Sequence, residues 1–286
     1  ALGGLLTGPA SGGVSTNPGI TVDAGGTITD NRTPSSTLAV NVDSQGLVEL
    51  QANQGIGTAS EPVFLRSGTL SVANNGTGVA GGIYVTEAAG AEDSTNGVEI
   101  TGWDQQASTG DSVLSTEKGP IEISGAVVHQ DGALTVTANA GSINQIADAG
   151  TFTVTNGPAS FTASGNNINL INGNDFGGPV AASGADISIT NLNPLQLGAV
   201  TATGNLTIRT GAPKGVTSSG LTQLPDTEAA ILDIAGTATF YADVVANQTA
   251  DLTTQNNVFV GAVEFLDGTG SGSWGTVRVK RAGDYL

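Results

Sequence analysis

The stretch that decides the fold is residues 186–209, which read DISITNLNPLQLGAVTATGNLTIR. At its two ends, residues 186–190 and 205–209 alternate Ile or Leu with polar residues. A period of two predicts short strands that bury one side and expose the other. Gly204 and Asn205 stand before the second strand, and both residue types tolerate the backbone angles of tight turns. We therefore expect strands of about five residues that are joined by tight turns.

The same alternation extends well beyond this stretch, for example over residues 133–138, 151–155 and 276–280. The threonines on the polar side suit strands because β-branched side chains fit a pleated surface. No segment of a dozen residues places apolar side chains at the three- and four-residue spacings of a helix. The sequence therefore predicts an all-β protein.

Two related units indicate an internal repeat. The first unit begins near Gly125 and the second near Gly198, an offset of 73 residues (198 − 125). Extra Gly, Pro and Ser residues fall within 210–228, and solenoids vary by such insertions at one corner of the repeating unit. We predict a single continuous β-solenoid over 1–286. Its coils are more divergent over 1–119, and 120–286 holds two related repeat units with an inserted loop near 210–228.

Dense short strands with repeat-like spacing favour a parallel β-helix. Coils of about 20 residues would stack at the spacing of neighbouring strands, which predicts about fourteen coils with irregular corner loops. The alternative fold is a pair of antiparallel β-sandwiches. The alternation never pauses for a linker, which favours the solenoid.

Composition excludes several classes of function. The chain has a formal net charge of −17 with eight Lys and Arg residues, so a nucleic-acid partner is not expected. No apolar run approaches the length that crosses a bilayer, so membrane insertion is not expected either. The chain has no Cys, which removes disulfides, thiolate nucleophiles and Cys-ligated metals. The acidic, Cys-free, Thr- and Asn-rich composition favours an exported protein.

Candidates for catalysis are few. His129 is the only His, and its alternating context predicts a residue at a strand edge or in a turn. A polysaccharide-cleaving β-helix would need outward carboxylates on adjacent coils, for which the candidates are Glu99, Asp104, Glu122 and Asp186. The acidic cluster at 87–93 lies in a Gly- and Ala-rich stretch, which indicates a solvated loop. We expect no enzymatic activity, no catalytic residues and no cofactor.

Two further sequence features have both a binding and a plain structural interpretation. Residues 172–175, Asn-Gly-Asn-Asp, offer oxygen ligands of the kind calcium takes, but no repeating series follows them, so a β-turn is expected. Pairs of Thr separated by one residue recur, and flat arrays of Thr are typical of ice-binding β-helices. The spacing of the pairs is irregular. They are Thr27/Thr29, Thr135/Thr137, Thr151/Thr153, Thr201/Thr203 and Thr237/Thr239.

A family resemblance rests on residues 174–180, 184–193, 195–200, 204–208 and 220–223. These stretches resemble filamentous haemagglutinin-like bacterial exoproteins, large surface adhesins with right-handed β-helical shafts. The resemblance is best over about 120–285. It implies a right-handed solenoid, export across an outer membrane, often by two-partner secretion, and a role in adhesion or biofilm formation. Residues 17–20, Asn-Pro-Gly-Ile, form a shortened version of the family's secretion-domain motif.

These observations predict a rigid surface shaft, or an extracellular filament or matrix element, outside the cell or on a bacterial cell surface. A glycan or another host- or cell-surface ligand is the expected partner, since Thr- and Asn-rich surfaces can bond hydroxyls without charge. The alternatives are a β-helix that binds or cleaves polysaccharides and an ice-binding solenoid. Head-to-tail self-association is also predicted, and the residues proposed for it are Leu5, Leu6, Val277, Arg278, Lys280 and Arg281.

Overall fold

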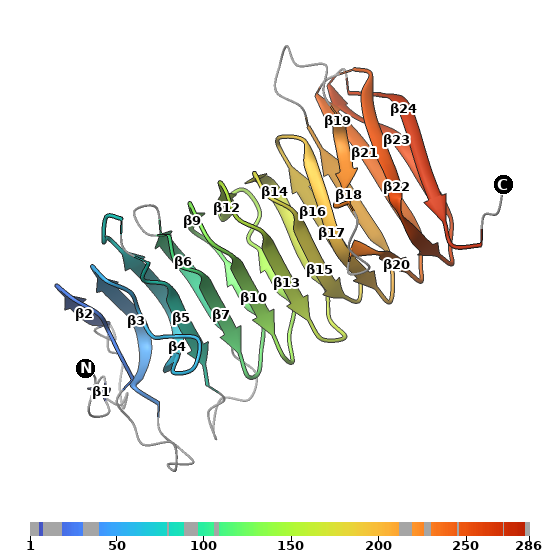
Figure 1. Cartoon of the computed structure of the whole chain (residues 1–286). Helices are drawn as coiled ribbons and strands as arrows, with labels where there is room; N and C mark the ends of the chain where they lie inside the picture. The colour runs from blue at the N-terminus through green and yellow to red at the C-terminus, as the bar shows by residue number, and fades with distance from the viewer. Residues whose placement is uncertain are drawn as a thin grey trace. The chain divides into compact units, whose positions relative to one another are not determined.

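The computed structural model describes most of the chain and consists of β-strands (Figure 1). The described residues are 6–7, 19–30, 40–78, 80–88, 97–105, 109–211, 219–225, 230–244, 246–270 and 272–283. They contain no α-helix, as the sequence predicts. Within these ranges, nothing helical is long and apolar enough to cross a membrane.

The chain divides into two compact units, Ala1–Thr151 and Phe152–Leu286. The strands of unit 1 are β1 (Leu6–Thr7), β2 (Ile20–Ala24), β3 (Val42–Ala52), β4 (Val63–Asn74), β5 (Ile83–Glu87), β6 (Val98–Gln105), β7 (Ser112–Thr116), β8 (Ile121–Ile123), β9 (Ala126–His129), β10 (Leu134–Ala138) and β11 (Ile143–Gln145). Those that follow are β12 (Thr151–Val154), β13 (Ala159–Ala163), β14 (Ile168–Phe176), β15 (Val180–Gly184), β16 (Ile187–Asn191), β17 (Leu195–Ala202), β18 (Leu206–Thr210), β19 (Ser219–Gln223), β20 (Leu232–Ile234), β21 (Ala238–Val244), β22 (Gln248–Phe259), β23 (Val263–Gly270) and β24 (Trp274–Arg281).

Within unit 1 the strands pair in parallel with strands one coil away. β5 pairs with β7 and β7 with β10, so that Ile83, Ser112 and Leu134 lie in register on three coils. β6 pairs along its first half with β8 and along its second half with β9. Parallel neighbours of this kind need a crossover rather than a hairpin, and here the rest of the coil provides it. The unit is therefore a stack of β-solenoid coils.

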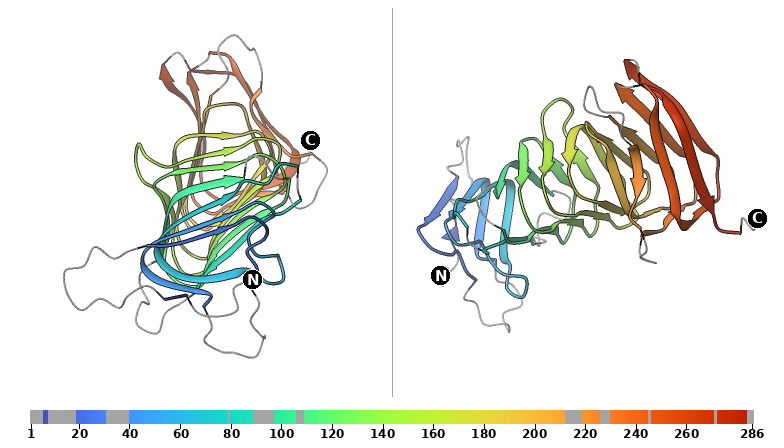
Figure 2. Two further views of the ribbon diagram at one scale, coloured as in Figure 1. Left: turned by 90° about the vertical axis from the view of Figure 1, so that its left-hand side faces the viewer. Right: turned by 45° about the horizontal axis from the view of Figure 1, so that its top comes forward.

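Unit 2 repeats this arrangement (Figure 2). β14 pairs with β16, β16 with β18 and β18 with β21, all in parallel. In consequence Leu170, Ile189, Ile208 and Phe240 lie above one another at the same place in four successive coils. The predicted fold class, an all-β parallel solenoid, is confirmed.

The prediction of about fourteen coils was wrong, because the structure has about nine. The reason is the length of the coils. Hydrogen bonds between neighbouring coils show how many residues one coil takes. Asp111 bonds to Ala133, 22 residues further on, whereas Asn205 bonds to Thr237, 32 residues further on. Residues added at the corners lengthen a coil without adding a strand, and fewer coils then fit in 286 residues.

The core lies between the strands of each coil and is filled by one side of each strand. β7, β10, β13, β16 and β18 alternate buried and partly exposed residues along their lengths. Most buried side chains are Val, Ile, Leu or Ala. Unit 2 adds a cluster of three phenylalanines, Phe152, Phe161 and Phe176, whose ring centroids lie 5.2 to 6.0 Å apart.

Close approach between coils explains part of the Gly content. A Cβ at Gly125 would collide with the carbonyl of Thr101 on the neighbouring coil. Such contacts leave no room for a side chain, so Gly is required where the backbones of two coils meet.

Buried polar side chains occupy corners of the coils. Asn174 and Asn191 lie in register, with exposed fractions of 0% and 2%. The Asn174 amide accepts a bond from Phe152 N at 2.9 Å and donates to the carbonyl of Thr190 at 3.0 Å. The tight turn expected at Asn172–Gly173 is instead part of β14, and buried amides satisfy the backbone groups where the chain bends.

Candidate functional site

The first candidate site is a row of hydroxyl side chains on the outer side of unit 1. Thr86 on β5, Ser115 on β7 and Thr137 on β10 lie in register on three successive coils. The side-chain oxygens of Thr86 and Ser115 are 2.9 Å apart and share a hydrogen bond. All three residues are partly exposed, so the row faces solvent.

Unit 2 carries a second row of the same kind. Thr162 on β13, Ser183 on β15 and Thr201 on β17 lie in register on consecutive coils. Asp233 on β20 is the next residue in register and introduces the first charge. Ser183 and Thr201 are exposed. We call these two sets the hydroxyl rows of units 1 and 2.

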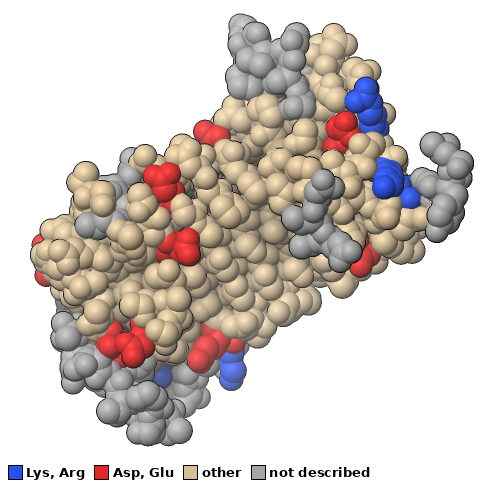
Figure 3. All heavy atoms as spheres, in the orientation of Figure 1, with Lys and Arg blue, Asp and Glu red and all other residues tan. Residues whose placement is uncertain are grey.

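The outward row next to the unit 1 row is uncharged. Tyr84, Val113 and Thr135 form the neighbouring outward row, two residues earlier on the same strands. Figure 3 shows the surface over β7 and β10 as mostly free of Lys, Arg, Asp and Glu. The strands of a parallel sheet are about 4.8 Å apart, so the row presents hydroxyl groups at a regular spacing.

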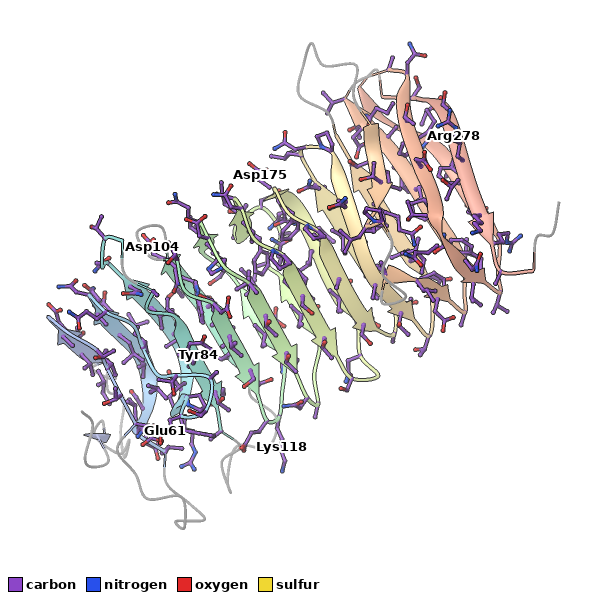
Figure 4. The ribbon with its side chains drawn as sticks, in the orientation of Figure 1. Glu61, Tyr84, Asp104, Lys118, Asp175 and Arg278 are labelled. Atoms are coloured by element: carbon purple, nitrogen blue, oxygen red, sulfur yellow. The ribbon has the colours of Figure 1, made fainter. Side chains whose placement is uncertain are left out.

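Tyr84 adds an aromatic group at one end of this surface (Figure 4). Burial, together with the nearby Asp111 carboxylate, raises the pKa of the Tyr84 phenol. The phenol therefore stays protonated at neutral pH and can donate a hydrogen bond. A tyrosine next to hydroxyl side chains offers both an apolar surface and polar groups to a ligand.

Two of the four candidate carboxylates come together. Glu99 on β6 and Glu122 on β8 lie in register on neighbouring coils. Asn144 on β11 follows on the next coil, and its amide donates to Glu122 at 2.8 Å. Neighbouring outward carboxylates can serve acid–base chemistry on a glycosidic bond. The alternation of residues predicts that both side chains face outward, but only the strand register shows that they are neighbours.

The other two candidate carboxylates lie elsewhere. Asp104 is on β6 as well, but its register neighbours are Ala73 and Val128. Asp186 belongs to unit 2, where its carboxylate accepts a hydrogen bond from Asn205 N at 2.7 Å. The four carboxylates therefore do not form one group.

The prediction of a solvated acidic loop at 87–93 was wrong at Glu87. Its side chain is only 5% exposed, and its carboxylate accepts hydrogen bonds from Ser67 N at 3.2 Å. The physical reason is the strand register, which places Glu87 opposite Leu65 and Thr116 on the inner side of β5. Residues 89–93 of that cluster lie outside the described residues.

The calcium candidate at 172–175 does not gather free oxygen ligands. Asn174 is buried and bonded to backbone groups, and the Asp175 carboxylate accepts a hydrogen bond from the Asn193 amide at 2.7 Å. In the part of the chain that the structure describes, no group of three or more His, Asp or Glu side chains is placed to hold a metal ion.

The Thr-x-Thr pairs do not build an array. Thr201 lies in register with Ser183 and Asp233. Thr153 lies in register with Asp175, and Thr239 with Thr207 and Glu264. Among the strand pairings described within each unit, none of the five pairs stacks on another. The arrangement therefore does not favour ice binding.

His129 ends β9 and points into the core with an exposed fraction of 0%. Among the described residues, neither ring nitrogen has a hydrogen-bond partner of standard geometry. Burial lowers the pKa of the imidazole, although the Gly132 backbone and the carboxylates of Asp111 and Asp131 act in the opposite direction. A ring that is enclosed and neutral is part of the core and cannot reach a substrate.

The burial of His129 predicts acid sensitivity. Its pKa is lowered in the fold, so below the unfolded value of about 6.5 the unfolded chain binds more protons than the folded chain. Stability is then complete above about pH 6.5 and falls by up to about 1.4 kcal/mol per pH unit below it. We expect urea unfolding at pH 7.5 and 5.5 to show a larger loss for the wild type than for His129→Gln. Equal losses in both proteins would rule out His129 as the cause.

Four of the residues proposed for self-association lie together on one strand. Val277, Arg278, Lys280 and Arg281 belong to β24, where Arg278 is labelled in Figure 4. Leu6 belongs to β1, which pairs with β3 at Val42. Leu5 lies outside the described residues.

Sequence comparison identifies two repeats over residues 109–265. Residues 109–183 and 184–265 each match a family described as repeats of unknown function (DUF5649). No curated protein and no solved structure matches the chain. The repeat character expected from the sequence is confirmed.

Proposed function

Because the chain belongs to the family of repeats of unknown function DUF5649, we propose its role from its own surface. The proposed role is that of an exported shaft, of the filamentous haemagglutinin-like kind, that acts outside the cell or on a bacterial cell surface in adhesion or biofilm formation. It works by binding neutral glycans and carries out no catalysis. The observation that carries this proposal is the hydroxyl row of unit 1, together with Tyr84 beside it.

Three features of that row support a neutral glycan as the ligand. Thr86, Ser115 and Thr137 offer both donors and acceptors, which suits the hydroxyl groups of sugars. This row and the outward row of Tyr84, Val113 and Thr135 carry no formal charge, so a polyanion gains no ion pair with them. The row also continues over three coils, and an extended polysaccharide can contact several coils at once. Several weak contacts on one chain then add up to useful affinity.

A binding assay with insoluble cellulose and chitin tests the proposal. We expect the wild type to be retained on at least one of them, and the double variant Ser115→Glu/Thr137→Glu to bind roughly ten-fold more weakly, about 1.4 kcal/mol. Its matched control is Ser188→Glu/Thr207→Glu, which places the same pair of charges in register on β16 and β18. Failure of the wild type to bind either polymer, or equal weakening in both variants, would contradict the proposal.

Polysaccharide cleavage is the second candidate function, and the in-register pair Glu99 and Glu122 favours it. Cleavage would release reducing ends from a soluble neutral polysaccharide, and Glu122→Gln would abolish that release. Asp104→Gln is the control, since Asp104 is on the same strand as Glu99 but is not paired with Glu122. Absence of reducing ends with the wild type would leave binding as the function.

A further inference from the structure

The last coil of unit 2 differs from the coils before it. β23 and β24 each pair with an earlier strand, β21 and β22 respectively, and within the described residues neither has a strand on its other side. Val277 lies in register with Ala250, and Val279 with Leu252, both of which are fully buried. Val277 itself is 41% exposed. The inner side of β24 therefore has the alternating apolar residues of a core strand, but no further strand among the described residues packs over it.

The first coil of unit 1 has a matching edge at β2. Ile20 and Val22 lie in register with the buried residues Val48 and Leu50, yet both remain partly exposed. Among the described strands, β2 pairs with β3 alone. Backbone groups at such an edge are free to pair with another strand, and an edge left in this state is a template for association.

The two edges are complementary in pattern. Along β24, Val277 and Val279 alternate with Arg278 and Lys280. Along β2, Ile20 and Val22 alternate with Thr21 and Asp23. Parallel pairing with Ile20 opposite Val277 places Val22 opposite Val279 and Asp23 opposite Lys280. A shift by one residue would turn Asp23 into the core, so the alternation fixes the register to even shifts.

The two edges are also complementary in charge. β24 carries three cations, Arg278, Lys280 and Arg281. The outward residues on β2 and its neighbour β3 include Asp23 and Glu49, which lie on the outer side of the first coils. The chain already uses this kind of contact between coils, because Arg278 lies in register with Asp251 and its guanidinium is 3.4 Å from that carboxylate.

We infer that β24 of one molecule pairs in parallel with β2 of the next, so that copies of this chain associate end to end. The occupant of the exposed edge is a second copy because the apolar alternation, the free backbone groups and the opposite charges of β2 match those of β24. The contact joins two different surfaces, so it is heterologous. A contact of this type propagates into a filament unless it closes into a ring.

A charge-exchange experiment on the whole chain tests this inference, with self-association measured by sedimentation velocity and filaments sought by negative-stain microscopy. We expect the wild type to associate more at higher protein concentration. Lys280→Glu and Asp23→Lys should each weaken association roughly five-fold or more, about 1 kcal/mol, because each places like charges across the contact. The double variant Asp23→Lys/Lys280→Glu should recover it, since the pair is restored with its charges exchanged.

Lys118→Glu is the control, because Lys118 is exposed in the turn before β8 and the substitution changes the net charge by the same amount as Lys280→Glu. A monomer at every concentration overturns the inference. Association that is unaffected by the single variants, or weakened equally by Lys118→Glu, overturns it as well. Glycan binding by Lys280→Glu should remain unchanged, so failure here is distinct from failure of the proposed adhesive function.

Discussion

Ile189→Asp is expected to unfold several coils of unit 2. Ile189 is 1% exposed and lies in register with Leu170 and Ile208, both fully buried. An aspartate there would place an unpaired carboxylate in an apolar core, at a cost of several kcal/mol. Circular dichroism during thermal and urea unfolding measures the loss. We expect either a large fall in the midpoint or no cooperative transition.

Thr190→Asp is the matched control for this experiment. Thr190 is the next residue, faces outward and lies in register with Arg209 on the following coil. A carboxylate at this position stays in water next to a cation, so stability should change by less than about 0.5 kcal/mol. If both substitutions lowered the unfolding midpoint equally, the assignment of inner and outer sides on β16 would be wrong.

Asn174→Leu has the second largest expected effect. The buried Asn174 amide accepts a bond from Phe152 N and donates to the carbonyls of Leu170, Asn172 and Thr190. Leucine matches its size approximately but leaves these backbone groups without their partner. The expected loss is about 2–5 kcal/mol, because several groups are left unsatisfied.

The comparison for Asn174→Leu is the same substitution at an exposed position. Asn167→Leu removes one side-chain bond, in which Asn167 accepts from Asp186 N at 3.2 Å. Water can replace that bond, so the expected loss is below about 1 kcal/mol. Urea unfolding followed by circular dichroism compares the two variants. Similar losses would show that the corner amide of Asn174 does not stabilise the coil.

The alternation of residues was enough to predict the strands and the fold class. Stretches such as 186–190 and 205–209 became β16 and β18, with their Ile and Leu side chains buried. The side on which a residue lies depends only on its neighbours in sequence, which is why short patterns carry this information.

The number of coils could not be predicted in the same way, because it depends on how far the chain travels between register neighbours. Thr86 and Ser115 are register neighbours 29 residues apart, and Asp186 and Asn205 are bonded across 19. Nothing local distinguishes residues that belong to a corner from residues that begin a strand. The hydroxyl row of unit 1 and the pair Glu99 and Glu122 were missed as groups for this reason, although each residue could be predicted to face outward.

Asn174 shows a different limit of prediction. An Asn-Gly pair is a turn signal, so residues 172–175 are predicted to form a β-turn. In the structure the chain bends at this point without leaving β14, and the Asn side chain turns inward to bond the backbone. Only the packing of the neighbouring coils decides between these two conformations.

The unequal lengths of the coils determine how this fold can change in evolution. For a flexible loop, the entropy lost on closing grows only with the logarithm of its length. By that relation, the coil that separates Asn205 from Thr237 by 32 residues costs about 0.5 kcal/mol more to close than the 19-residue coil before it. Residues inserted at a corner therefore leave the stack almost as stable as before. A lineage can acquire new corner loops, and with them new binding specificities, while the strands that support them keep their register.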